Sequence, residues 1–510
     1  MKIAFVNDSC QQLGVQYLAS MLKRNGHEFR LFIDPQLFDD EIISVKSLNR
    51  FFDYKKRIIQ DLKTYKPDLI GISVVTDFYQ WASTMAKMIK QEMDVPIIFG
   101  GIHPTSVPER VIKNDFVDMV CVGEGEYPML ELANSMQKGS IDYSIKNIWF
   151  KHNGNIIQNE VRPLIEDLDS LPQPDISIYF AASPHFRKTG LYVTMASRGC
   201  PYYCSYCCHS YLHELYRGKG KRIRQRSVAN LMQELINVKN KYPIKFIAFM
   251  DNCFGYDVSW LKEFAKEYKE KIGTKFWCIM HPNHVSEESV FYLKAAGCNT
   301  VDMGIQSWNS KTRSEILNRD VQDETMEQAI AIIKNAKIEL MTDSIFGLPG
   351  QNEDDVLASA IRYVNIRPNR IYFYMLRHYP STRITRKARD DRRVNTDRYE
   401  QLMEGVNVTS FAIGGDGVNR RSLQFQILFY LIDLLPRSCS RFIIKRKIHR
   451  FFPTLFGPAV IVILRNIIAF DINARLLRSA AYYKYSYFTI KKILGINFRR
   501  IRLSTQEVSR

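Results

Sequence analysis

Short apolar runs alternate with amphipathic stretches along most of the chain. Over the first 140 residues, five runs have the length of strands, at 2–6, 29–33, 69–75, 96–99 and 117–122. Between them, apolar residues recur at helical spacing, as over 15–25 and 79–92. Strands that alternate with helices form a parallel sheet that is covered by helices on both faces. Residues 1–140 are therefore predicted to form a Rossmann-like, doubly wound α/β domain.

From residue 191 the chain repeats a strand followed by a helix. The strand-like runs are at 191–197, 244–250, 274–280, 299–305, 338–346 and 369–376. The helical patterns between these runs are at 227–240, 257–272, 286–296, 323–336 and 353–365. Six such units make a partial (β/α)6 barrel of the TIM type, in which functional groups sit at the carboxyl ends of the strands. We expect this barrel to extend over residues 186–385.

Two parts of the chain lack this alternation. Residues 141–185 contain many turn-forming residues, with Asn-Gly-Asn at 153–155 and a run with several prolines at 162–175, which predicts a linker. Residues 386–510 contain helical stretches rich in Leu, Ile, Phe and Arg, which predict a mostly helical C-terminal domain. A chain of 510 residues is long enough for about three domains of roughly 100–200 residues each.

The positive charge of the chain is concentrated in its last quarter. Residues 381–510 hold 25 Lys and Arg against 9 Asp and Glu, so they carry +16 of the total formal charge of +18. An uncharged run at 451–464 lies between 441–450 and 491–500, two segments that mix cations with bulky apolar residues. The run is shorter than the roughly 20 residues that cross a bilayer. We therefore expect the last domain to bind an anionic membrane surface.

Two other interpretations of the basic domain were considered. An ordinary helical cap with a solvated basic face has the same composition. Nucleic acid is not expected as a partner, because no recognised nucleic-acid motif accompanies the charge. The chain begins with an apolar run and no basic leader, and its ten cysteines are scattered apart from those at 200–208. We expect a cytoplasmic protein, with a peripheral place on the inner face of the membrane if the last domain binds lipid.

Three cysteines in the run CPYYCSYC, Cys200, Cys204 and Cys207, give the strongest chemical signal. Iron–sulfur clusters take cysteine thiolates, and three thiolates are one too few to close a 4Fe-4S cluster. Zinc and buried free thiols are the alternatives. No second Cys-x-x-Cys or histidine pair follows at zinc-finger spacing, so the cluster is the preferred interpretation. Cys208 is expected to be a neutral neighbour.

The motif resembles the signature loop of the radical S-adenosylmethionine enzymes. The resemblance implies that the open iron of the cluster binds the amino and carboxylate groups of S-adenosylmethionine and delivers an electron that yields a 5′-deoxyadenosyl radical. Tyr206 fills the aromatic position that the family has before the last cysteine. An electron donor such as flavodoxin or ferredoxin is expected as a partner.

The other strand ends of the predicted barrel also carry polar or turn-forming residues. By resemblance, Asp251 corresponds to the contact with the amino group of S-adenosylmethionine, Gln306 and Ser307 to contacts with its ribose or carboxylate, and Gly347 to the adenine site. The family often has glutamate where Gln306 stands, so a hydrogen bond is expected there and not a carboxylate role. Helix caps and a simple turn are the alternatives. His281 is a candidate for a substrate or cofactor contact.

The first domain resembles the cobalamin-binding domain that precedes many radical S-adenosylmethionine modules, through the segments 13–29, 66–75, 99–105 and 122–126. The resemblance implies a pocket for the nucleotide tail of cobalamin. Its predicted lining consists of Ser73, Gly100, Gly101, Gly123 and Glu124. The Asp-x-His-x-x-Gly motif that supplies a histidine to cobalt is missing from the loop after the first strand. A bound cobalamin would lack this ligand; a pocket that has lost cobalamin is the alternative.

The resemblance covers residues 1–385 and implies three cofactors, a 4Fe-4S cluster, S-adenosylmethionine and cobalamin. Proteins of this architecture include methyltransferases that act on unactivated carbon or phosphorus, and oxidative cyclases. We expect a cobalamin-dependent methyltransferase that acts on a small-molecule or lipid-like substrate. The alternatives are a radical cyclase or rearrangement enzyme without methyl transfer, and a non-enzymatic cobalamin-binding sensor. No catalytic residue beyond the cofactor ligands is predicted.

Overall fold

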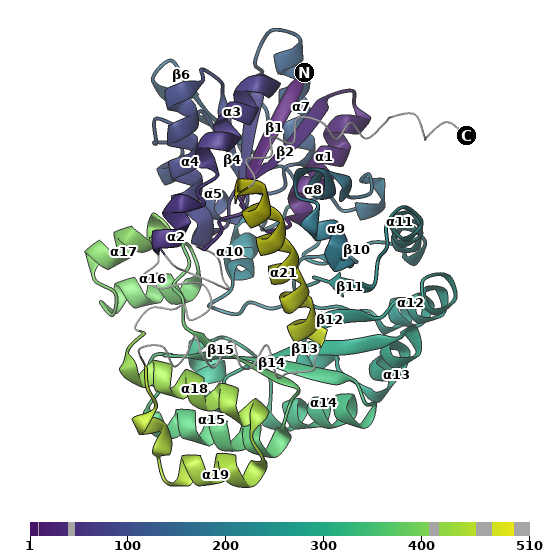
Figure 1. Cartoon of the computed structure of the whole chain (residues 1–510), viewed down its shortest axis with the longest axis vertical. Helices are drawn as coiled ribbons and strands as arrows, with labels where there is room; N and C mark the ends of the chain where they lie inside the picture. Colours follow the sequence, from purple (N-terminus) through teal and green to yellow (C-terminus); the bar gives the residue numbers. More distant parts are fainter. Residues whose placement is uncertain (9, 39–45, 407–417, 455–471, 494–510) are drawn as a thin grey trace.

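The computed structural model describes residues 1–8, 10–38, 46–406, 418–454 and 472–493 (Figure 1). It contains two large sheets, one in the amino-terminal part of the chain and one in the central part. The first lies at the top of Figure 1 and the second below it. Helices cover both sheets, and one C-terminal helix runs across the front of the molecule.

The first sheet has seven strands. In order of pairing they are β2 (Glu28–Ile33), β1 (Lys2–Asn7), β3 (Leu69–Ser73), β4 (Ile97–Gly100), β5 (Met119–Cys121), β6 (Ile148–His152) and β7 (Asn155–Gln158). The strands from β2 to β5 are parallel. One face packs against α1 (Leu13–Arg24) and α7 (Glu126–Gln137), and the other against α3 (Lys55–Tyr65) and α4 (Tyr79–Glu92). The predicted doubly wound domain is therefore confirmed.

Part of the stretch predicted as a linker, 141–185, belongs to this sheet. Strand β6 pairs antiparallel with β5, and β7 pairs with β6 through the two-residue turn Asn153–Gly154. Both turn residues have positive φ, 49° and 75°, as a type I′ turn requires. The Asn-Gly pair is thus a hairpin signal, and the connection between the sheets begins only after β7. It contains the short helices α8 (Ser177–Ala182) and α9 (His185–Thr189).

The second sheet has six parallel strands that pair in chain order. They are β8 (Leu191–Thr194), β11 (Phe246–Phe249), β12 (Phe276–Met280), β13 (Cys298–Gln306), β14 (Glu339–Phe346) and β15 (Arg370–Met375). The helices between them are α11 (Val228–Lys241), α12 (Val258–Lys271), α13 (Glu287–Ala296), α14 (Asp323–Asn335) and α15 (Glu353–Ile366). This is the predicted partial (β/α)6 barrel, with bounds within a few residues of those expected.

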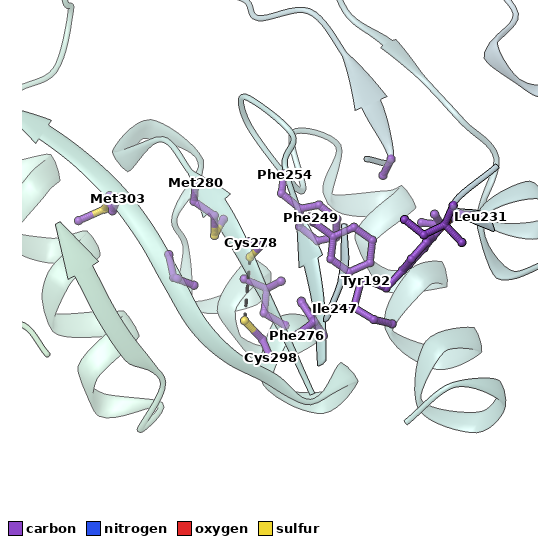
Figure 2. Packing of buried hydrophobic residues seen from close by; sticks show 14 of the residues in the cluster. Tyr192, Leu231, Ile247, Phe249, Phe254, Phe276, Cys278, Met280, Cys298 and Met303 are labelled. Carbon is purple, nitrogen blue, oxygen red and sulfur yellow. Dashed lines mark hydrogen bonds between the residues drawn. The ribbon is translucent and has the colours of Figure 1, made fainter. Parts of the chain in front are cut away.

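An aromatic core fixes the strands of this barrel to its outer helices (Figure 2). The ring centroids of Phe249 and Phe276 lie 5.4 Å apart at 90°, and both rings meet Phe264 of α12. The thiols of Cys278 and Cys298 lie 4.0 Å apart in the same layer and are free. These cysteines therefore serve packing, far from the motif at 200–207.

The open edge of the partial barrel is covered by α18 (Arg420–Leu434). This helix is buried around most of its surface, as expected for an element inside a large protein. Its Phe429 packs against Phe346 and Phe373, and its Asp433 accepts a hydrogen bond of 3.3 Å from the backbone N–H of Ile371 on the edge strand. Residues beyond 386 therefore help to complete the barrel.

Four further helices follow the barrel strands in the described part of the C-terminal region. They are α16 (Arg383–Asp390), α17 (Thr396–Met403), α19 (Arg437–Lys445) and α21 (Ile472–Ile493). Helix α21 crosses the front of the molecule in Figure 1 and packs against α9. Its Phe488 lies in the core of the first domain, where the hydroxyl of Tyr54 donates a 2.7 Å hydrogen bond to the Phe488 carbonyl.

Within the described residues, no helix has both the length and the apolar character needed to cross a bilayer. The apolar run predicted at 451–464 is described only up to residue 454, and the basic segment 491–500 only up to residue 493. The remaining residues of both segments lie outside the described part of the chain.

Candidate active site

The three motif cysteines lie on the loop that follows the first barrel strand. The loop starts with β9 (Ser197–Arg198), which pairs with β10 (Arg224–Gln225). Gly199 comes next, with φ of 96°, and a Cβ there would lie 1.7 Å from the carbonyl oxygen of Arg222. Only glycine fits this position. The turn into the cysteine loop therefore requires glycine at position 199.

Hydrogen bonds from distant segments hold the loop in place. Ser205 donates both of its hydrogen bonds to a segment distant in sequence. Its N–H donates to the carbonyl of Leu317 at 2.8 Å, and its hydroxyl donates to the carbonyl of Ile316 at 2.6 Å. The side-chain amide of Asn318 donates to the carbonyl of Tyr203 at 2.8 Å, and the N–H of Ile384 donates to the carbonyl of Ser205 at 2.9 Å. The loop is thus preorganised by protein contacts alone.

The thiols of the loop differ in acidity. Cys207 stands at the amino end of α10 (Cys208–Leu215), and its pKa is lowered to about 7 by a hydrogen bond from the Cys208 thiol, with help from the His209 N–H. The same bond raises the pKa of Cys208, which is therefore the neutral donor of the pair. Burial raises the pKa of Cys200 to about 11. The thiolate is the form that binds iron, and of these three thiols Cys207 has the lowest pKa and deprotonates most readily.

The donor set of the loop fits an iron–sulfur cluster better than a single metal ion. In the described part of the chain, no three His, Cys, Asp or Glu side chains converge closely enough to hold one ion. A 4Fe-4S cluster binds each thiolate at a separate iron, so it does not need this convergence. Three cysteines on one rigid loop are the ligand set that such a cluster takes.

Arg319 is a site residue that the sequence motifs did not indicate. Its side chain is 6% exposed, and its Nη1 lies 3.8 Å from the sulfur of Cys204 and 3.5 Å from the hydroxyl of Tyr206. Its Nη2 donates a 2.5 Å hydrogen bond to the carbonyl of Gly304 on β13. The guanidinium therefore compensates negative charge at Cys204 and connects the cysteine loop to the fourth barrel strand.

Asp251 is engaged by the protein itself. Its carboxylate accepts hydrogen bonds from the N–H of Ala196 at 3.0 Å and the hydroxyl of Ser197 at 2.5 Å. Burial raises its pKa to about 6 in spite of these bonds. The neighbouring Asn252 donates to the carbonyl of Gly199 at 3.3 Å. Asp251 thus anchors the start of the cysteine loop, and its contact with S-adenosylmethionine stays a prediction.

Gln306, at the end of the fourth strand, has a φ of 66° at a register shift in β13. It stands two residues after Gly304, whose carbonyl binds Arg319, the residue that contacts Cys204. The hydroxyl of Ser307 accepts a hydrogen bond from the N–H of Asn309 at 3.2 Å. The contacts of Gln306 and Ser307 with S-adenosylmethionine stay predictions.

Gly347 stands at the end of β14 with a φ of 71°. A Cβ there would lie 2.6 Å from the terminal methyl group of Met375, so the turn has no room for a side chain. The next residue, Leu348, belongs to a small apolar cluster against which Tyr206 packs. The predicted adenine site and the cysteine loop therefore meet through Leu348.

His281, at the end of the third strand, stacks on Tyr202 of the cysteine loop with ring centroids 3.7 Å apart at 16°. Its Nδ1 accepts a hydrogen bond from the N–H of Asn283 at 3.3 Å. Its Nε2 is buried without a hydrogen-bond partner among the described residues. Burial lowers the pKa of His281 to about 2, so the imidazole is neutral and keeps one free nitrogen at the site.

On the side of the first domain, Ser73, Gly100 and Gly101 lie together at the carboxyl ends of β3 and β4. Gly101 has a φ of 94°, and a Cβ there would lie 2.8 Å from the backbone N and O of Val74 and 3.3 Å from the Ser73 hydroxyl. Glycine at this position therefore lets the chain pass close to the backbone of Val74, where a side chain would collide. These residues fit a cradle for a large ligand such as the cobalamin tail.

The turn after β5 joins the two domains. Glu124 forms ion pairs with Arg198 at 3.3 Å and Arg224 at 2.7 Å, and Glu126 pairs with Arg198 at 2.7 Å. A Cβ on Gly123 would overlap the hydroxyl of Tyr216, which itself accepts from the N–H of Glu124 at 3.0 Å. The Glu124 side chain therefore holds the cysteine loop, and its contact with cobalamin stays a prediction.

The loop after β1, where the family motif lacks its histidine, is occupied by the protein. The hydroxyl of Tyr179, from α8, accepts from the side chain of Asn7 at 3.1 Å and from the N–H of Gln12 at 2.8 Å. The side chain of Gln12 donates to the carbonyl of Ser73 at 3.2 Å. His103, which follows β4, is buried, packs against the ring of Tyr79 and forms a hydrogen bond with the Thr76 hydroxyl.

A cavity of about 300 Å³ lies between the first domain and the cysteine loop. The first domain contributes the loops after β4 and β5, and the barrel contributes α10 and the strand β10. The lining residues that matter here are Gly101, Thr105, Gly123, His209, His213 and Arg224. Because α10 begins directly after Cys207, one short helix connects the cluster ligands to the glycine cradle.

Comparison with known proteins supports this division of the chain. Residues 195–360 match the radical SAM superfamily, and residues 3–133 match the B12 binding domain. The chain thus contains a B12-binding domain followed by a radical SAM domain.

An uncharacterised methyltransferase of Pyrococcus horikoshii is 28% identical over 378 residues, which is 73% of this chain and 77% of the relative. An anaerobic magnesium-protoporphyrin IX monomethyl ester cyclase of Rubrivivax gelatinosus is 23% identical over 67% of this chain and 59% of the relative. The solved structure of the radical S-adenosylmethionine methyltransferase TsrM from Kitasatospora setae, with cobalamin and a [4Fe-4S] cluster, has a TM-score of 0.62 at 18% identity. The match covers 76% of this chain and 78% of that chain.

The fold and the two matched domains define the class: the chain is a radical SAM enzyme. More particularly, it is a radical SAM enzyme with an amino-terminal B12-binding domain, and its cofactors are a 4Fe-4S cluster, S-adenosylmethionine and cobalamin.

We expect anaerobically reconstituted protein to hold about four irons per chain, with the broad absorbance of a cluster. The triple variant C200A/C204A/C207A should lose both, because it removes the three ligating thiolates. C208A is the matched control, since Cys208 is a neutral donor to Cys207, and it should keep the iron. Iron analysis and visible absorbance check this; full iron in the triple variant would contradict the assignment.

Proposed function

We propose that the chain is a cobalamin-dependent radical S-adenosylmethionine methyltransferase. The observation that carries the proposal is the cavity shared by the two domains, with the glycine cradle on one side and α10 on the other. An enzyme that transfers a methyl group from one cofactor to a substrate activated by the other needs both cofactor sites at one place. The methyltransferases among the relatives and solved structures support the same reading.

Bound at these sites, S-adenosylmethionine and the cluster supply the radical that activates the substrate, and cobalamin supplies the methyl group. Cys200, Cys204 and Cys207 hold the cluster on a loop that Asp251 and Arg319 keep rigid. Ser73, Gly100 and Gly101, at the carboxyl ends of β3 and β4, would hold cobalamin. Tyr206, Gln306 and Gly347 border the place for S-adenosylmethionine.

The substrate in this proposal is a small or lipid-like molecule with an unactivated carbon or phosphorus. The electron that starts the reaction comes from a small redox protein such as flavodoxin or ferredoxin. Cyclisation without methyl transfer is the second candidate, because a cyclase is also among the relatives. The two candidates differ in what becomes of the methyl group of S-adenosylmethionine.

We also propose that the C-terminal region touches an anionic membrane surface. Two aromatic side chains near its basic cluster face solvent, Phe442 at 58% and Phe451 at 83% exposure. Between them lies the exposed run Lys445–Lys447. Exposed aromatic rings beside cations suit the interface of an anionic bilayer, where each cation near the surface contributes about 1 kcal/mol.

Methyl transfer predicts two products from S-adenosylmethionine. The reconstituted protein, reduced by flavodoxin and its reductase, should form S-adenosylhomocysteine only when cobalamin is added, and 5′-deoxyadenosine with or without it. Mass spectrometry of both nucleosides checks this, with C200A/C204A/C207A as the control that forms no 5′-deoxyadenosine. Formation of 5′-deoxyadenosine with no cobalamin-dependent S-adenosylhomocysteine would reject methyl transfer and favour the cyclase.

Membrane binding predicts co-sedimentation with vesicles that contain phosphatidylglycerol, and weaker binding to neutral vesicles. Salt should reduce it, because the field of the lipid decays within a Debye length of about 8–10 Å. F442A/F451A should bind several-fold less than wild type. F291A is the matched control, an exposed phenylalanine of α13 at 67% exposure, and should bind like wild type. Equal binding of the two variants, or none to either vesicle, would reject the proposal.

A further inference from the structure

The interior of the barrel contains two carboxyl groups, those of Asp302 on β13 and Asp343 on β14. The residues beside them face the outer helices. The hydroxyl of Ser344 lies 2.5 Å from that of Tyr363 on α15, and Met303 is fully buried in the helix-facing core shown in Figure 2. Successive side chains of a strand point to opposite faces. Asp302 and Asp343 therefore point into the barrel.

The two carboxyl groups are diagonal neighbours. Asp343 pairs with Gly304, and Asp302 stands two residues before Gly304 on the same strand. Burial raises the pKa of Asp343 to about 7. Burial also raises the pKa of Asp302, and the neighbouring Asp343 raises it further. No ion pair of either carboxylate occurs within the part of the chain that the structure describes, so the repulsion between the two groups is offset only in part, by the nearby charge of Arg319.

Three buried polar atoms on the interior faces of adjacent strands have no hydrogen-bond partner among the described residues. They are Oδ1 of Asp302, Oδ1 of Asp343 and Nε1 of Trp277. Asp302 is only 9% exposed. Trp277 lies lower in the barrel, because it pairs with Thr300, two residues before Asp302. The two orphaned carboxylate oxygens leave a polar ligand to complete the site.

Two tyrosine rings lie near the acid pair on the interior face of the barrel. Tyr372 and Tyr374 of β15 lie on the same face as Asp343, since Asp343 pairs with Tyr372 and Ile345 with Tyr374. Their rings are parallel within 6°, with centroids 5.9 Å apart. Tyr374 is 40% exposed although it faces the interior, so solvent reaches this part of the barrel. Carboxylates together with aromatic faces are the usual surroundings of a bound organic cation.

Arg319 lies between the acid pair and the cluster ligands. Arg319 contacts the sulfur of Cys204 and donates to the carbonyl of Gly304, which pairs with Asp343. The charge of Arg319 lowers the pKa of Asp343, so the guanidinium lies near that carboxylate. A group held by Asp343 therefore lies within a few side chains of the place where the radical is formed.

We propose that Asp302 and Asp343 bind a cationic nitrogen group of the substrate, an amine, amidine or guanidine, inside the barrel. The inference rests on the proposed function, because it names the substrate class of the same site. Two carboxylates accept several N–H bonds from such a group and neutralise its charge, and the cation relieves their repulsion. A neutral analogue of the same shape leaves both carboxylates unpaired, so the site rejects it.

Binding of small probes tests this without knowledge of the substrate. In the cluster-reconstituted full chain, benzamidine and benzylamine should bind by saturation-transfer NMR, and the neutral isosteres benzamide and benzyl alcohol should bind about 10-fold more weakly or not at all. D302N/D343N should lose the preference. D94N, at an exposed loop residue, is the matched control and should keep it. Absence of cation binding, or equal binding of the isosteres, would overturn the proposal.

Stability distinguishes a ligand site from a structural acid pair. The pKa of Asp343 rises from 3.8 to about 7 on folding, so the native state binds the extra proton and stability falls as pH rises from about 4 to 7. Asp302, Tyr372, Tyr374 and Arg319 face this group. D343N should remove that fall and unfold at an equal or higher temperature than wild type at pH 8.

D251N is the contrasting variant, because Asp251 accepts three hydrogen bonds, and it should unfold at a lower temperature. If D343N lost as much stability as D251N, Asp343 would be structural and the proposal would fail. Probe binding and unfolding report on the acid pair alone. The nucleoside assay reports on methyl transfer, so a failure of one account is distinguishable from a failure of the other.

Discussion

The arrangement of the active site depends on a buried ion-pair network between the two domains. Glu124 and Glu126, on the turn after β5, bind Arg198, and Glu124 also binds Arg224. The four side chains are between 5% and 16% exposed, so water screens them little. Loss of one partner would leave a buried charge unpaired, at a cost of about 3–5 kcal/mol. Arg198 lies two residues before Cys200, so the network fixes the cysteine loop relative to the first sheet.

The other supports of the site act on the same loop. Asp251 holds its first residues from the second barrel strand, and Arg319 holds its middle from the segment after the fourth. The glycine cradle of the first domain is positioned by the backbone of β3 and β4. The cofactor sites are thus set by the folded chain, as electrostatic preorganisation of a catalytic centre requires. The acid pair of the barrel stands out because neither carboxylate forms an ion pair within the part of the chain that the structure describes.

Much of the fold follows from the spacing of apolar residues, because each buried parallel strand is a short apolar run between helical patterns. The hairpin of β6 and β7 was missed, although the Asn153–Gly154 turn signals it, because its strands are partly exposed and weakly patterned. The role of α18 was missed as well. Its apolar residues surround the helix, and that pattern does not say which element it packs against.

The sequence predicts where the residues of the candidate site lie along the chain, but not which groups of the protein they bind. Motifs put Glu124 and Asp251 at strand ends, where ligands bind, but both carboxylates are used by the protein. Arg319 and the pair Asp302 and Asp343 belong to no motif. Arg319 is more than 100 residues from Cys204, so only the folded barrel brings them together. The three cysteines could be recognised in the sequence because all three cluster ligands lie within one loop.

The Glu124 network sets the distance between the two cofactor sites. Pulsed EPR on protein that holds cob(II)alamin and the reduced cluster measures that distance through their two unpaired electrons. Wild type and E131Q, whose ion pair with Arg162 lies on the surface, should both show one narrow distance. E124Q should show a broad or shifted distance. A distance distribution for E124Q as narrow as that of wild type, at the same position, would contradict it.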